Sequence, residues 1–131
     1  MILTLKTDTP TATIGLHSAT THEKKHDKTW EVGRELSVEI LPTIEALCEE
    51  DGILMSGITG VIVYEGPGSY TGLRIAISVA NAIGSSYKIP VIGSSGETWL
   101  QDGFIHLASA TEFKQVAPVY GGEVYTTKPR K

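Results

Sequence analysis

A glycine-rich loop between two apolar segments constrains the fold of this 131-residue chain more than any other feature. Residues 61–64, before the loop, are a β-prone run that suits a strand covered on both faces. Residues 75–87, after the loop, contain no charged side chain, so a helix there must be covered on more than one side. A strand, a glycine loop and a largely buried helix in this order predict a layered α/β fold.

The segments around this unit predict further strands and helices. Turn-forming residues at 7–10 separate two β-prone runs, which indicates an antiparallel hairpin. The polar residues 17–28 are expected to form a solvated loop or the tip of a hairpin. The remaining predictions are strands over 2–5, 12–16, 29–32 and 91–92, an amphipathic helix over 35–50 that contains Pro42, a helix beginning in 96–100, and two short strands within 116–131.

Composition narrows the function classes. The net charge of -4 argues against autonomous nucleic-acid binding, which needs a basic face to neutralise phosphates. Cys48 is the only cysteine and cannot form an internal disulfide, and it lies on the apolar side of its helix, where packing is favoured over a nucleophilic role. No apolar run reaches the roughly 20 residues of a membrane span. We therefore expect a cytoplasmic protein that does not enter a membrane.

The glycine loop runs Gly66-Pro67-Gly68-Ser69-Tyr70-Thr71-Gly72-Leu73-Arg74, and its backbone amides could hold an anion at the start of the helix. The dinucleotide-binding pattern requires glycine where Thr71 stands, and the P-loop requires lysine where Leu73 stands. A nucleophile elbow around Ser69 requires glycine in place of Pro67 and Thr71. The alternative is a tight turn in which Ser69 or Thr71 caps the helix, without any ligand.

This loop resembles the signature loop of the TsaB (YeaZ) proteins. The resemblance extends to residues 2–16, 36–47, 89–95 and 122–125. It implies an α/β fold of the actin-like (ribonuclease H-like) kind, a mixed sheet with flanking helices. Residues 1–100 would form the N-terminal actin-like domain. Residues 101–131 would be a short remnant, with C-terminal strands, of a second lobe that is largely missing.

The same resemblance implies a non-catalytic scaffold that dimerises with TsaD and supports the transfer of threonylcarbamoyl to the adenosine beside the anticodon of tRNA. TsaE, an ATPase, would join the complex, and tRNA would be contacted only through it. The chain alone would form a homodimer and bind no cofactor, with a nucleotide possible at the complex interface. Lys6 stands where the wider superfamily has an aspartate, so no catalytic or metal-binding residue is expected.

Two helices are expected to form the partner interface. If Leu73, Ile77, Ala80 and Ile83 face the sheet, a second apolar stripe of the same helix remains for another surface. The expected interface residues are Leu36, Ile40, Ile44, Ile75, Ala76, Val79 and Ala82. The alternative is that the C-terminal segment folds back and covers this stripe.

The sequence is also compatible with two other functions. A homodimeric interaction module unrelated to tRNA would have the same surface. A nucleotide-dependent enzyme or a peptidase would need a metal or nucleophile cluster. His22 and His26 have metal-ligand spacing on a helix, but their polar surroundings favour a solvated loop.

Overall fold

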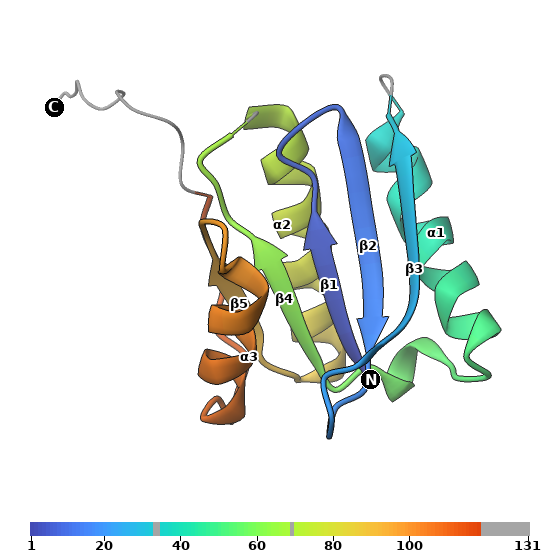
Figure 1. Cartoon of the computed structure of the whole chain (residues 1–131), viewed down its shortest axis with the longest axis vertical. Coiled ribbons are helices and arrows are strands. Elements are labelled where there is room, and N and C mark those ends of the chain that lie inside the picture. Colours follow the sequence, from blue (N-terminus) through green and yellow to red (C-terminus); the bar gives the residue numbers. More distant parts are fainter. Residues whose placement is uncertain (33–34, 69, 119–131) are drawn as a thin grey trace, which may run out of the picture.

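The computed structural model describes residues 1–32, 35–68 and 70–118, which form one five-stranded mixed sheet with helices on both faces (Figure 1). The strands are β1 (Ile2–Lys6), β2 (Thr11–His17), β3 (Lys24–Glu31), β4 (Gly60–Tyr64) and β5 (Val91–Ser94). The helices are α1 (Leu36–Glu50), the short 3-10 helix η1 (Met55–Gly57), α2 (Tyr70–Tyr87) and α3 (Trp99–Ala108).

The order of the strands across the sheet is β3-β2-β1-β4-β5. β1, β2 and β3 form an antiparallel meander, whereas β1, β4 and β5 run parallel to one another. β1 is therefore the central strand, and Leu3 pairs with Leu16 on one side and with Val61 on the other. The helices between the parallel strands provide the crossovers that such pairing requires.

α1 and α2 lie together behind the sheet in Figure 1, and α3 lies in front of β4 and β5. The main core fills the space between the sheet and the first two helices. It contains alternate residues of the strands and the inward stripes of both helices, and its largest fully buried side chains include Leu3, Leu5, Ile14, Leu16, Ile40, Ile44, Val61, Val63 and Leu73. On the opposite face, α3 approaches β4 closely at Gly103, next to Ile62.

The mixed sheet with flanking helices confirms the predicted fold class. β2 ends at His17 and β3 begins at Lys24, so the loop or hairpin tip expected over 17–28 is confirmed for residues 18–23 and wrong for His17 and residues 24–28. Two side chains explain how such a polar strand is held: the indole Nε1–H of Trp30 donates to Oε1 of Glu39 at 2.9 Å, and His26 contacts Asp51 at 3.0 Å. Glu39 belongs to α1 and Asp51 directly follows it, so these two contacts connect β3 to α1.

The structure does not confirm the expected domain boundary and gives no strand in the described C-terminal residues. Residue 100, the expected domain boundary, lies inside α3, which packs on β4 and β5. Residues 116–118 form no strand, and the expected strand over 122–125 lies outside the described residues. None of the helices in the described ranges combines the length and the apolar character needed to cross a membrane.

Candidate functional site

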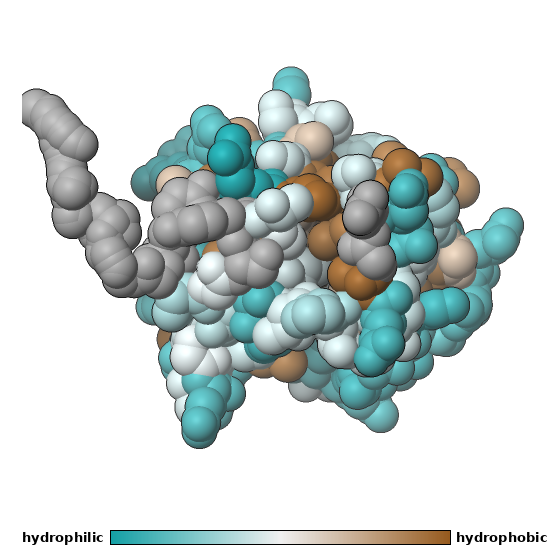
Figure 2. Space-filling view, turned by 90° about the horizontal axis from the view of Figure 1, so that it is seen from above, coloured by the Kyte–Doolittle hydropathy of each residue, from teal (hydrophilic) through white to brown (hydrophobic). Residues whose placement is uncertain are grey.

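The three parallel strands end at the same edge of the sheet, where the glycine loop joins β4 to α2 (Figure 1). Loops at the carboxyl ends of parallel strands are the usual location of ligand sites in α/β folds. Figure 2 views this edge from above and shows apolar surface bordered by polar groups. We call the groups that follow β1, β4 and β5 here the strand-end site: Lys6, Asp8, Tyr64, Glu65 and Ser95.

The glycine loop packs against the turn that follows β1. The Gly66–Pro67 peptide bond is cis, and Gly66 has a φ of 118°, which side chains other than glycine rarely adopt. A Cβ added at Gly68 would lie 2.6 Å from Cβ of Asp8, so only glycine permits this close approach. The Thr7 hydroxyl donates to the carbonyl oxygen of Gly72 at 2.7 Å. The first turn of α2 is thereby fixed to the end of β1.

The charged groups of the strand-end site are already paired within the chain. Nζ of Lys6 lies 2.6 Å from Oδ1 of Asp8 and 4.5 Å from the centre of the Tyr64 ring. Glu65 accepts a hydrogen bond from the Ser95 hydroxyl at 3.3 Å. The cation at the end of β1 is therefore neutralised by its neighbour, and the arrangement positions the loop.

The structure separates the nine signature residues into buried and exposed positions. Gly66 and Leu73 are buried, and the exposed members are Pro67, Gly68, Thr71 and Arg74. Gly72 is half-buried. Ser69 lies outside the described residues, and of Tyr70 only its place as the first residue of α2 is described. The described loop thus presents Pro67 and Gly68 together with the outer side of the first turn of α2.

Four of the seven residues expected at the partner interface lie in the chain's own core. Leu36, Ile40 and Ile44 form the inward stripe of α1, and Ala76 is fully buried in α2. The expectation that these side chains form an outer surface is wrong, because each lies on the inward face of its helix: Ala76 is three residues after Leu73 and four before Ala80, which are also fully buried.

The outer apolar surface of the two helices is made by other side chains. Ile75 and Val79 are half-buried and Ala82 is exposed, at spacings of four and three residues along one side of α2. On α1, Val38 is 65% exposed and Leu41 is 43% exposed. We call these five residues the α1–α2 surface. The sequence analysis did not predict Val38 and Leu41, although Val38 lies about half a turn from the inward stripe of α1, which could have identified it.

The C-terminal segment covers the opposite flank of α2. The Asn81 side chain donates to the carbonyl oxygen of Val116 at 2.9 Å and accepts from its backbone N–H at 3.0 Å. Phe113 packs beside Gly84, where an added Cβ would lie 2.6 Å from its ring. The described part of this segment therefore folds back on α2, but on the flank opposite the expected stripe, so the alternative that it covers that stripe is wrong for these residues, and Ala82 stays exposed.

Two titratable side chains are buried away from this edge. Burial raises the pKa of the Cys48 thiol, and its Sγ lies 4.0 Å from Sδ of Met55 inside the core. This agrees with a packing role. Burial also lowers the pKa of His17. Within the described ranges, no three His, Cys, Asp or Glu side chains gather in a way that could hold a metal ion.

Comparison with known proteins identifies the family. Residues 20–118 match the model of the family described as TsaD, tRNA N6-adenosine threonylcarbamoyltransferase. The tRNA threonylcarbamoyladenosine biosynthesis protein TsaB of Escherichia coli is 30% identical over 92 residues, which are 70% of this chain and 40% of that protein. TsaB of Bacillus subtilis is 28% identical over 93 residues, which are 69% of this chain and 38% of that protein.

One solved structure is similar to this chain both in fold and in sequence. YeaZ from Pseudomonas aeruginosa superposes with a TM-score of 0.64 at 27% identity, covering 72% of this chain and 43% of that one. The chain thus spans about two fifths of the length of these relatives. The actin-like sheet, the signature loop and these matches agree, and the chain belongs to the TsaD family and, within it, to the TsaB (YeaZ) proteins.

Proposed function

We propose that this chain is a non-catalytic scaffold subunit that pairs with TsaD in the cytoplasm and supports the formation of threonylcarbamoyladenosine in tRNA. The names of its relatives support the pathway, because TsaB proteins are tRNA threonylcarbamoyladenosine biosynthesis proteins. TsaE would join through the assembled pair, tRNA would be contacted only within the complex, and the chain would form a homodimer when alone.

The α1–α2 surface is the observation that carries the proposal. It exposes two large apolar side chains, Val38 and Leu41, on α1, which packs against α2. Exposed apolar side chains on neighbouring elements mark a protein interface in a small protein. On α2 the exposed Ala82 and the half-buried Val79 are small, which leaves room for a partner helix to approach closely.

We propose that a nucleotide, if one takes part, binds at the junction with TsaD and not to this chain alone. The strand-end site supports this assignment. Lys6 is engaged by Asp8, and Gly68 lies directly against Asp8, so the turn after β1 occupies the space over this part of the loop. The described part of the loop therefore does not fit a phosphate cradle unless a partner rearranges or completes it.

The proposal is tested by mixing the chain with TsaD of the same organism and measuring the mass and affinity of the complex by light scattering and calorimetry. A Val38→Asp variant, and separately an Ala82→Asp variant, should weaken the heterodimer about tenfold or more, because each places a charge in an apolar contact. The modification of tRNA by the reconstituted complex should fall in parallel.

The matched control is Ile105→Asp on α3. Ile105 is 63% exposed, close to the value for Val38, but it lies on the other side of the sheet. This variant should bind TsaD as the native chain does. An unaltered heterodimer in all three variants would contradict the assignment of the surface, and modification that proceeds equally well without the chain would contradict the function.

A further inference from the structure

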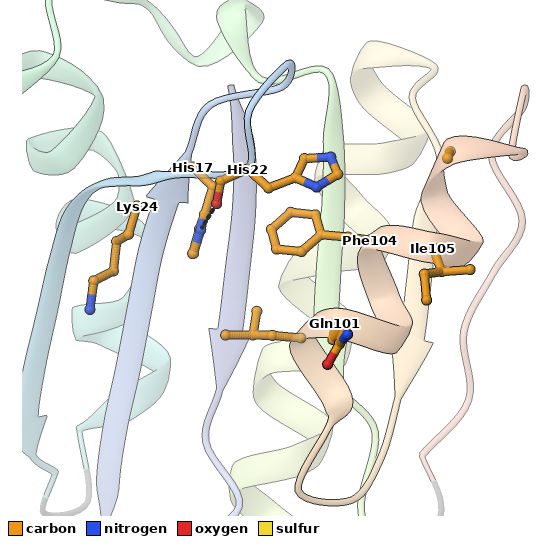
Figure 3. A pocket seen from close by; sticks show the side chains of 8 residues that line it. His17, His22, Lys24, Gln101, Phe104 and Ile105 are labelled. Carbon is orange, nitrogen blue, oxygen red and sulfur yellow. Dashed lines mark hydrogen bonds between the residues drawn. The ribbon is translucent and has the colours of Figure 1, made fainter.

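A cavity of about 820 Å³ lies between α3 and the loop that joins β2 to β3, on the sheet face opposite α1 and α2. Its walls include Leu100, Phe104, Ile105 and Ala108 of α3, with His17 on β2. We call it the α3 pocket. Figure 3 shows Ile105 at one end and Lys24 at the other, with Phe104 between them. A mainly apolar cavity of this volume with a few polar groups is typical of small-molecule sites.

Aromatic contacts hold the walls of the pocket in place. The Phe104 ring stacks on the His22 ring with a centroid distance of 4.2 Å and an interplanar angle of 8°. It also meets the His17 ring edge-on, with a centroid distance of 5.3 Å. The loop between β2 and β3 is thereby fastened to α3. A pocket whose walls are fixed before binding loses less entropy when a ligand enters.

His17 supplies an unsatisfied hydrogen-bonding atom in this wall. Its side chain is buried, and Nδ1 lies 3.2 Å from the carbonyl oxygen of His22. A carbonyl only accepts, so Nδ1 carries the proton, and Nε2 of the neutral ring must be an acceptor. Within the described residues Nε2 has no hydrogen-bond partner, and it lies above Gly15, 3.1 Å from where a Cβ would stand.

The surroundings of His17 lower the pKa of its ring, which favours the neutral form. Burial is the main cause that lowers its pKa, and Lys24 and His22 act in the same direction, while the His22 carbonyl and Asp27 oppose them. Lys24 is itself bound to Asp27 at 2.9 Å at the rim of the pocket. His17, which lines the pocket beside apolar side chains, therefore carries a buried acceptor atom.

We propose that the α3 pocket binds a small, mainly apolar molecule whose single N–H or O–H group donates to Nε2 of His17. The apolar body would contact Phe104, Leu100 and Ile105, and the donor would satisfy an acceptor that is otherwise buried without a partner. Polar groups of the ligand would lie at the rim, near Gln101 and Lys24. This site is separate from the α1–α2 surface and does not depend on the proposed function.

Two probes that differ in one group test the role of the donor. Indole carries an N–H where indene, of nearly the same shape, carries a CH₂. In ¹H–¹⁵N and histidine side-chain NMR titrations of the full chain, indole should shift the signals of His17 and Phe104. It should bind about three- to tenfold more tightly than indene, because one hydrogen bond to a buried acceptor is gained. Equal affinities, or shifts from neither probe at millimolar concentration, would overturn the proposal.

A pair of surface variants locates the site. Ile105→Asp places a charge in the wall of the pocket and should lower indole affinity at least fivefold, whereas Val38→Asp, on the other face, should leave it unchanged. Both positions are exposed, so both variants should fold, which circular dichroism verifies. The reverse pattern is expected for TsaD binding, so failure of one proposal is distinguishable from failure of the other. Equal indole binding by both variants would place the probe elsewhere and contradict the assignment.

Discussion

Replacing Gly103 by alanine should destabilise the chain although alanine is the better helix former. Gly103 lies inside α3, and an added Cβ would stand 2.5 Å from Cγ2 of Ile62 on β4, with Cδ1 at 3.2 Å and Cγ1 at 3.3 Å. Ile62 is fully buried and cannot move aside. The change gains about 1 kcal/mol of helix propensity but incurs about 1–3 kcal/mol of overpacking. We expect a net loss of about 1 kcal/mol in the free energy of unfolding.

Urea unfolding followed by tryptophan fluorescence measures this loss, since Trp99 begins α3 and its ring meets Tyr64 edge-on at 5.8 Å. The control is a double-mutant cycle with Ile62→Ala, which removes the three carbons that the new methyl would meet. If the clash is the cause, Gly103→Ala should be neutral or stabilising in that background. A native-background variant stabilised by about 1 kcal/mol would refute the reasoning, because α3 would then be free to shift away from the sheet.

The remaining predictions concern the core and its response to pH. Ile44→Ala should lower the free energy of unfolding by about 2–5 kcal/mol, because Ile44 is fully buried. Leu41→Ala, on the exposed side of α1, should change it by no more than about 0.5 kcal/mol. Equal losses of the two variants in urea unfolding would contradict the assignment of the two faces of α1. Burial lowers the pKa of His17 in the folded state, so the unfolded chain binds more protons below about pH 6.5, and stability should be lost as the pH falls through that region. His17→Phe should reduce this loss below about pH 6.5 in denaturation curves, and an unaltered pH dependence would show that His17 does not contribute to it.

Local sequence patterns were sufficient to predict the two helices, α1 and α2, that connect the parallel strands. The uncharged run after the glycine loop predicted α2, and the apolar spacing over 35–50 predicted α1 with Pro42 inside it. The nine-residue loop also indicated the TsaB family, because such a run of glycine, proline and threonine places strict conditions on the backbone. These predictions succeeded because each depends on residues close together in the chain.

The prediction of the interface residues failed in part because it depends on contacts between residues far apart in the chain. Helical spacing shows which residues share a side of a helix, but it does not show how much of the circumference neighbouring elements cover. Ala76 is buried because it shares the inward face of α2 with Leu73 and Ala80, and Val38 is exposed because it lies on the side of α1 opposite the inward stripe.

The α3 pocket could not be predicted from the sequence at all. His17, His22 and Phe104 are separated by up to 87 residues, and only the packing of α3 across the sheet brings their rings together. The sequence alone determined most of the helices and strands and the α/β class, since these follow from local patterning, and the resemblance of one specific loop indicated the family. The tertiary structure alone decided which apolar side chains face solvent and which buried acceptor lacks a partner, since both depend on contacts between residues far apart in the chain.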